Sequence, residues 1–361
     1  MKTASHRIVG SGLFALDVVV RTDGTKVPPK LGGSAGNVLG ILGALGWTAT
    51  PVGLVGDDDA GKVLRSDFAS IEADLRFMYP SSQCDTPVIY QHQVSLGHGL
   101  THRFSFACPN CGERRRPSWD DEDVFGNVAE QLPSSSVFFL DRPTPLGVAL
   151  AEHYSASGAV VVFEPSSIGD DERLFSRAVR ASTIVKYSDD RLESLDDFDV
   201  GGVRIEIQTR GANGLRFRKP ALGDDWVHLG AYALPYVHDT SGAGDWCTAG
   251  MLYALFSGAK RSAQSLSLDE VFEALAFGQA LSTLNCMTEG ARGLLSHWPA
   301  HQVKTWAREL SQARIDALHR AQVDHSSLVR DPRLDTFAVQ LQRAGGEASL
   351  SPDNLNCCFS S

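Results

Sequence analysis

The chain has 361 residues, of which 43% are hydrophobic and 21% are charged, and its formal net charge is −10 at pH 7. This suffices for one large α/β domain or two small ones, and the acidic balance argues against nonspecific binding to nucleic acid or an anionic membrane. The seven cysteines are odd in number and mostly scattered, which argues against a secreted disulfide framework. No apolar run reaches the ~18 residues of a membrane span, so we expect a soluble, cytoplasmic protein.

Short β-branched runs alternate with helical patterns along the chain. The candidate strands are Arg7–Gly10, Val18–Arg21, Thr50–Val55, Val88–Val94, Arg103–Phe106, Val137–Leu140, Val160–Phe163, Ile184–Lys186, Arg204–Thr209 and Leu215–Arg218. Helical stretches between them include Ser34–Leu45, Gly61–Ile71 and Leu266–Leu284. Several strands lack polar alternation, which is typical of central strands covered on both faces. This order predicts an α/β fold in which a parallel sheet lies between layers of helices.

Two regions depart from this alternation. Residues 13–31 and 85–107 are rich in strand signals and predict a small separate sheet, such as a lid, with the second region extending to about residue 117 through a cysteine-bearing insertion. Residues 323–361 are polar, with one short helical pattern at Leu334–Arg343. We interpret 1–322 as the main domain and 323–361 as an appendage or a partly disordered tail.

The segment Asp239-Thr-Ser-Gly-Ala-Gly-Asp245 precedes an apolar helix over Trp246–Leu255. Gly242, Ala243 and Gly244 let successive backbone N–H groups point into one concavity at a helix N-terminus, which forms an anion hole suited to phosphoryl oxygens. A carboxylate beside bound phosphate costs electrostatic energy unless it has a task. The task that fits Asp245 is to accept the proton of an attacking alcohol late in phosphoryl transfer. The alternative is a glycine-rich turn that only caps a helix.

Two further glycine segments are weaker signals. Gly32-Gly33 allows a ligand to approach the backbone, and Asn37 on the first turn of the next helix offers a donor and an acceptor for sugar hydroxyls; a plain turn before a core helix is the alternative. Thr209-x-Gly211-x-x-Gly214 lies between two strands and offers a nucleotide a backbone surface, although hairpins often carry glycine.

Gly56-Asp-Asp-Asp-Ala-Gly-Lys-Val63 has the spacing of a phosphate-binding P-loop. Val63 replaces the Ser or Thr that holds Mg²⁺, and three consecutive aspartates would repel a triphosphate. We therefore reject a P-loop here.

Taken together, these motifs resemble the PfkB (ribokinase-like) family of carbohydrate and nucleoside kinases, in order, over roughly residues 6–300. The resemblance implies a Rossmann-like three-layer domain with a β-sheet lid, and it implies ATP and Mg²⁺. It also implies that the acceptor's hydroxyls bind at Asp17, Gly33 and Asn37, that Gly242, Ala243 and Gly244 form the anion hole, and that Asp245 is the base. Lys186, Thr209, Gly211 and Gly214 would lie near the nucleotide.

Three features depart from the family pattern. Lys186-Tyr-Ser-Asp-Asp-Arg191 stands where many members have Lys-Pro-Asn-x-x-Glu, and Glu164-Pro-Ser-Ser stands where Asp-x-Asn is usual, so Glu164 would face the phosphates through solvent and Mg²⁺. Cys108-Pro-Asn-Cys111-Gly resembles one knuckle of a zinc ribbon, which supplies two of four ligands. Cys84, His92, His98, His102 or a second chain would complete a Zn²⁺ site; free thiols or a redox role are the alternatives.

The motifs predict an ATP-dependent kinase that phosphorylates a hydroxyl of a sugar or sugar-like small molecule. A nucleoside kinase of the same family is one alternative, and a catalytically silent nucleotide- or sugar-binding sensor is another. The lid is also a candidate surface for a homodimer, because lid sheets expose edges and apolar faces. Which acceptor is used is left open at this point.

Overall fold

The computed structural model describes residues 6–96, 99–117, 126, 128, 130–220, 223, 225–258, 265–321 and 327–345. Most of residues 323–361 therefore lie outside the described part of the chain, apart from 327–345. Within the described residues, no helix combines the length and the apolar character needed to cross a bilayer.

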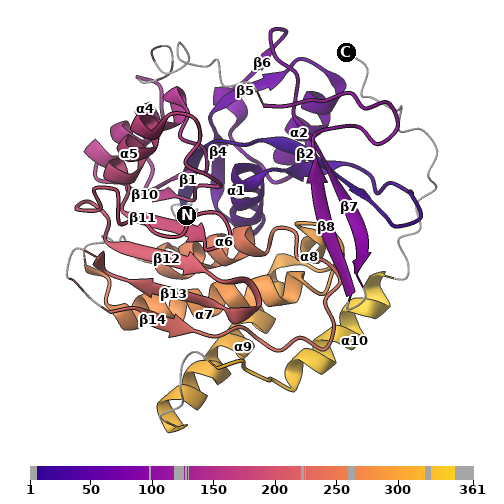
Figure 1. Ribbon diagram of the computed structural model, residues 1–361, viewed down its shortest axis with the longest axis vertical. Helices are drawn as coiled ribbons and strands as arrows, with labels where there is room; N and C mark the ends of the chain where they lie inside the picture. The colour runs from indigo at the N-terminus through magenta and orange to yellow at the C-terminus, as the bar shows by residue number, and fades with distance from the viewer. Residues whose placement is uncertain are drawn as a thin grey trace, which may run out of the picture.

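An eight-stranded sheet forms the centre of the protein, in the order β14-β13-β12-β11-β10-β9-β1-β4 (Figure 1). The strands from β12 to β4 in this order pair in parallel, and β13 and β14 add an antiparallel edge. The bounds are β1 (Arg7–Ser11), β4 (Thr48–Pro51), β9 (Val137–Leu140), β10 (Val160–Phe163), β11 (Ile184–Ser188), β12 (Ile205–Thr209), β13 (Leu215–Arg218) and β14 (Val227–Leu229).

Helices cover both faces of this sheet, because successive side chains of a strand point to opposite faces. In β9, Val137 and Phe139 join one apolar cluster, while Phe138 and Leu140 join the other. The first cluster includes residues of α1 (Ser34–Ala44), α6 (Ala243–Phe256), α7 (Leu268–Asn285), α8 (Gly293–His297), α9 (Ala300–Ala321) and α10 (Arg333–Gly345). The second includes α4 (Pro145–Ala156) and α5 (Glu172–Ala181). The three-layer α/β/α architecture predicted from the sequence is confirmed.

Local sequence fixes where several helices begin. Ser267 and Glu270 form a reciprocal capping box at the start of α7. Thr144 caps α4, whose first residue is a proline. Asp58 caps α2 (Asp59–Ser70) by accepting a hydrogen bond from the backbone N–H of Gly61 at 2.7 Å. Its other oxygen accepts from the N–H of Thr86, outside the helix, at 2.9 Å. The aspartates that resemble a P-loop thus include a helix cap.

A second sheet is built from the two strand-rich regions. Its order is β3-β2-β7-β8, with β2 (Ala15–Val20), β3 (Lys30–Gly32), β7 (Val88–Leu96) and β8 (Gly99–Ser105). Figure 1 shows β7 and β8 as long paired strands beside the main sheet. We call this four-stranded sheet the lid.

One expected strand is in fact two. The sequence predicts a single strand over Thr50–Val55, but the chain leaves the central sheet after Pro51, and β5 (Gly53–Gly56) pairs with β6 (Met78–Ser81) in a separate two-stranded sheet. Proline has no N–H group to continue the ladder. A short 3₁₀ helix, η1 (Leu75–Phe77), leads into β6, and another, η2 (Gly211–Asn213), joins β12 to β13.

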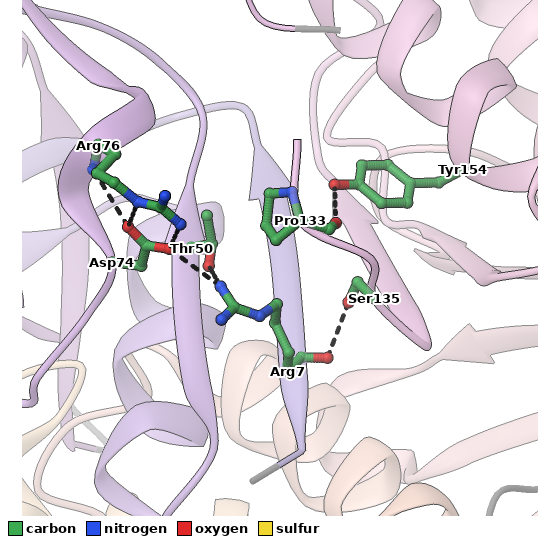
Figure 2. Close-up of polar contacts among 7 residues, drawn as sticks. All are labelled: Arg7, Thr50, Asp74, Arg76, Pro133, Ser135 and Tyr154. Atoms are coloured by element: carbon green, nitrogen blue, oxygen red, sulfur yellow. Dashed lines mark hydrogen bonds and ion pairs between the residues drawn. The ribbon is translucent and has the colours of Figure 1, made fainter. Parts of the chain in front are cut away.

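A cluster of polar side chains holds the first residue of β1, Arg7, to neighbouring segments (Figure 2). Arg7 donates through Nη1 to Thr50 Oγ1 at 2.8 Å and to Asp74 Oδ2 at 3.1 Å. Arg76 binds the same carboxylate through Nε and Nη2, at 2.8 and 2.7 Å. These bonds, Arg76 first and then Arg7, lower the pKa of Asp74 to about 2.

We expect Asp74→Asn to lower the free energy of unfolding by about 1–2 kcal/mol at pH 7, because charge-assisted hydrogen bonds are lost. The pKa of Asp74 is lower in the folded chain than its ordinary value, so this stabilisation is present above about pH 4–5 and is lost as pH falls toward 2. Urea denaturation at several pH values measures the difference. The matched control is Glu152→Gln in the exposed Arg177–Glu152 pair, for which we expect less than about 0.5 kcal/mol. A gap between wild type and Asp74→Asn that does not shrink on acidification would contradict this account.

Candidate active site

A cavity of about 580 Å³ lies along the carboxyl ends of the parallel strands and under the lid. Ligands of open α/β sheets bind at this edge, where loops leave the strands. Twelve residues singled out from the sequence line this one cavity: Asp17, Gly33, Asn37, Glu164, Lys186, Thr209, Gly211, Gly214, Gly242, Ala243, Gly244 and Asp245. They come from segments more than 200 residues apart, and the fold brings them together.

Asp245 lies in the first turn of α6 and is buried. The Nδ2 group of Asn37 in α1 donates to Asp245 Oδ2 at 2.8 Å. Burial raises the pKa of Asp245 well above its ordinary value, and the nearby Glu164 carboxylate raises it further. This combination of a cavity position, a fixed orientation and an elevated pKa is typical of groups that exchange a proton with a ligand.

The glycine turn before Asp245 places backbone N–H groups at the start of α6. Gly242 caps α6 with φ 72°, in the left-handed region. The N–H of Ala243 donates to Thr240 O at 3.2 Å, so it already has a protein partner. The N–H groups of Gly244 and Asp245 belong to the first helical turn, where an α-helix leaves its amide donors without intrahelical acceptors. The helix dipole adds to the attraction for an anion at this point.

Lys186 and Glu164 form one ion pair at the floor of the cavity. Lys186 Nζ contacts Glu164 Oε1 and donates to the carbonyl oxygen of Gly244 at 3.3 Å. Thr248 in α6 donates through Oγ1 to the other Glu164 oxygen at 2.5 Å. Burial opposes the charge on Lys186, but the Glu164 carboxylate raises its pKa, so the ammonium group persists. The Lys186 ammonium group is therefore held next to the glycine turn, and the Glu164 carboxylate balances its charge.

The part of the cavity next to β1 and the lid holds polar atoms that lack protein partners. Within the described residues, Asp17 Oδ1, Asn37 Oδ1 and Gln91 Oε1 are buried and accept no hydrogen bond. Burial raises the pKa of Asp17 to about 7, although Arg292 acts in the opposite direction. Buried polar atoms are normally satisfied, so a ligand with several hydroxyl donors fits this arrangement.

The segment around Thr209 forms the opposite end of the cavity. Thr209 ends β12, and its Oγ1 donates to Tyr187 O at 3.4 Å. Gly211 has φ 53° and has no atom within 4 Å of a Cβ placed on it, so the turn has an open side. At Gly214, by contrast, a Cβ would lie 2.2 Å from Leu229 O. This turn thus offers bare backbone to the cavity.

The cysteine pair lies apart from this site. Cys108 is buried and Cys111 is exposed, and neither lines the cavity. Despite burial, backbone hydrogen bonds from Cys111 and Asn110 lower the pKa of the Cys108 thiol to about 6. No group of three or more His, Cys, Asp or Glu side chains that could hold a metal occurs among the described residues, so the four-ligand zinc site is not formed there. His98 and the side chain of His102 lie outside the described part.

Two cavity residues, Gln91 and Arg142, were not found from the sequence. Gln91 lies inside β7 in the polar run Gln91-His92-Gln93, which does not show which of the three faces a ligand. Arg142 and its neighbour Asp141, which does not itself line the cavity, directly follow the fully apolar strand β9, and a polar pair at the carboxyl end of such a strand is a signal that would have identified Arg142.

Comparison with known proteins gives a consistent result. Residues 12–298 match the sequence pattern of the family described as "pfkB family carbohydrate kinase". An ATP-dependent ribose-1-phosphate kinase from Halopiger xanaduensis is 28% identical over 305 residues, covering 79% of this chain and 94% of that protein. A fructokinase from Xylella fastidiosa with bound ATP superposes with a TM-score of 0.66 at 17% identity, covering 84% of this chain and 99% of the other. A nucleoside kinase from Burkholderia thailandensis in complex with inosine gives a TM-score of 0.60 at 17% identity, with 86% and 97% covered.

Proposed function

We propose a reaction for a chain that belongs to the pfkB family of carbohydrate kinases. Membership confirms the resemblance drawn from the motifs and makes the protein a kinase of the sugar or nucleoside type. In our proposal it transfers the γ-phosphoryl group of ATP to a hydroxyl of a sugar or sugar-like small molecule, with Asp245 as the base. The observation that carries this is the Asn37–Asp245 hydrogen bond at the glycine-lined start of α6, inside the cavity.

The acceptor would bind in the part of the cavity next to β1. Asp17, Asn37 and Gln91 each offer an oxygen without a protein partner, and the backbone of Gly33 allows close approach. At Gly33 a Cβ would lie 2.3 Å from Leu13 O, so a side chain is excluded there. A sugar hydroxyl that donates to these oxygens would be held with its own oxygen near Asp245.

The transferred phosphoryl group would lie against the glycine turn. The N–H groups of Gly244 and Asp245, together with Lys186, would stabilise negative charge on its oxygens. Thr209, Gly211 and Gly214 would contact the nucleotide. Asp245 would take the hydroxyl proton on its carboxylate late in the transfer, when the oxygen of the acceptor has already become acidic.

The kinase reaction implies Mg²⁺, and one carboxylate of the cavity suits it. Mg²⁺ keeps several waters and binds through one or two carboxylates plus substrate phosphates, so the absence of a three-ligand cluster among the described side chains does not conflict with it. Glu164, already engaged by Lys186 and Thr248, would reach the ion through water. The ion would supply neutralisation of phosphate charge.

We expect acceptor-dependent formation of ADP when the purified protein is supplied with ATP, MgCl₂ and a panel of sugars, sugar phosphates and nucleosides. A coupled ADP assay measures the rate, and mass spectrometry of the product identifies the phosphorylated compound. Activity with one member should exceed the rate without acceptor by at least about 10²-fold, because the intact base contributes a factor of this order. ATP hydrolysis that no acceptor stimulates, over the whole panel, would contradict the proposal.

A nucleoside is the second candidate acceptor. Phe104 and Phe106 of the lid segment line the cavity, and 56% of Phe104 is exposed. A large apolar ring exposed at a cavity favours a planar partner that can stack on it. A nucleobase attached to ribose is such a partner, and the nucleosides in the panel test it.

A further inference from the structure

The order of strands divides the cavity into two halves. The carboxyl ends of β12, β11, β10, β9 and β1 follow one another along it. Thr209 ends β12 and Gly211 follows it at the nucleotide end, and Leu13 follows β1 at the other end, close to Asp17. Arg142 follows β9, which pairs directly with β1. With β10 and β11 between it and β12, Arg142 belongs to the acceptor half.

Arg142 is held in place by a buried neighbour. Its Nη1 donates to the carbonyl oxygen of Asp141 at 2.8 Å and to Asp141 Oδ2 at 3.3 Å. Asp141 is fully buried, and its Oδ1 accepts from the N–H of Leu13 at 2.8 Å. At Gly12 a Cβ would overlap Asp141 Oδ1, at 1.7 Å. The end of β1 and the guanidinium are therefore fixed to the same carboxylate.

Most donors of Arg142 are unused by the protein. A guanidinium carries five N–H donors, and within the described residues only those of Nη1 are hydrogen bonded. Its side chain is 22% exposed and lines the cavity. The other cations of the cavity lie toward the nucleotide, since Lys186 is in β11 and Arg191 follows it. Among the described residues that line the acceptor half, Arg142 is thus the one cation, beside the carboxylates of Asp17 and Asp245; Arg292, which acts on Asp17, is buried behind the lining and binds Leu31 O.

A neutral sugar needs no such cation, because Asp17, Asn37 and Gln91 already supply acceptors for its hydroxyls. A planar guanidinium with free donors is suited to a phosphate, which it binds in a bidentate manner. We infer that the acceptor carries its own phosphate-like anionic group and that Arg142 binds this group. This deepens the proposed function, on which it rests, and names the acceptor class as phosphate monoesters of sugars.

The experiment compares ribose, ribose 1-phosphate and ribose 5-phosphate as acceptors. We expect the wild type to use one phosphate ester with a kcat/KM at least about 10²-fold above that of ribose, as a charge-assisted bidentate contact allows. Arg142→Gln should remove about 10²-fold from kcat/KM for that ester, while kcat/KM for ribose and the KM for ATP change less than about 3-fold. Arg142→Lys should recover part of the loss, because it restores the charge without the fork. The matched control is Arg177→Gln on the surface, which should leave kcat/KM for the ester, kcat/KM for ribose and the KM for ATP unchanged.

Three outcomes overturn the inference. In the first, kcat/KM for ribose equals or exceeds kcat/KM for both of its phosphate esters. In the second, Arg142→Gln and Arg142→Lys lower kcat/KM for ribose and the ester alike, which indicates a structural role beside Asp141. The third comes from calorimetry without ATP: wild type binds the ester no more tightly than Arg142→Gln does. Tight, Arg142-dependent binding of the ester without any turnover would uphold the inference and contradict only the proposed function.

Discussion

Replacing Asp245 by Asn is expected to lower kcat by about 10³-fold, because a positioned general base contributes a factor of 10² to 10⁴. The amide oxygen can still accept the hydrogen bond that Asn37 donates, so the side chain keeps its place while losing its basicity. The dissociation constant of ATP, measured by calorimetry, should change less than about 3-fold. Coupled measurement of ADP formation with the acceptor found in the panel gives kcat.

The control for Asp245→Asn is Asp269→Asn. Asp269 also lies in the first turn of a long apolar helix, α7, but outside the cavity, and its replacement should change kcat less than about 2-fold. The two variants should also differ in stability. Asp245 is a buried carboxylate whose charged form is disfavoured by its surroundings, so Asp245→Asn should match or exceed the wild type in free energy of unfolding. An active Asp245→Asn variant would rule out Asp245 as the base.

The pH dependence of the wild type follows from the same burial. The base must be ionised to accept a proton, so kcat/KM should fall as pH decreases. Because the pKa of Asp245 is raised in the folded protein, this fall should occur at a higher pH than the ordinary value of about 4 for an aspartate.

Local patterns predicted much of the fold. The strands β9 and β10 consist of four apolar residues each and are buried on both faces, as their lack of alternation indicated. Pro51 marks in the sequence where β4 can end, but the pairing of β5 could not be predicted, because its partner β6 lies more than 20 residues further along the chain. The partner of a strand is a property of the tertiary fold, and sequence periodicity does not carry it.

The same limit applies to the site. The residue types around Asp245 indicated phosphoryl chemistry because a glycine turn, a helix start and a carboxylate are contiguous. Lys186 and Glu164 were assigned separate roles, near the nucleotide and near the metal, whereas the structure joins them in one ion pair. Asp239 had no role assigned. Its carboxylate accepts hydrogen bonds from the N–H groups of Ser241 and Gly290, both at 2.7 Å, and so shapes the glycine turn.

Replacing a glycine of this turn by alanine should have a second large effect, which differs between Gly242 and Gly244. Gly242 has φ 72°, and a Cβ there would lie 2.5 Å from the backbone oxygen of Ala291. We expect Gly242→Ala to lower the free energy of unfolding by about 3 kcal/mol, since left-handed strain costs about 1–2 kcal/mol and the overlap with backbone adds a comparable amount. Chemical denaturation measures this loss, and activity should fall with it because the turn must shift.

Gly244→Ala should separate activity from stability. A Cβ at Gly244 would lie 3.4 Å from Glu164 Oε1 and 3.5 Å from Lys186 Nζ, which are ordinary contacts. Alanine also favours a helix over glycine, so the free energy of unfolding should change by less than about 1 kcal/mol. The new methyl group would nevertheless occupy the place where we propose that phosphoryl oxygens bind, and kcat/KM should fall by about 10²-fold, as for a displacement of about 1 Å in a reacting group. Full activity in Gly244→Ala would show that phosphoryl oxygens do not bind at this turn. A Gly242→Ala variant as stable as the wild type would contradict the expected strain at Gly242. The pair therefore distinguishes a glycine needed for folding from one needed for phosphate.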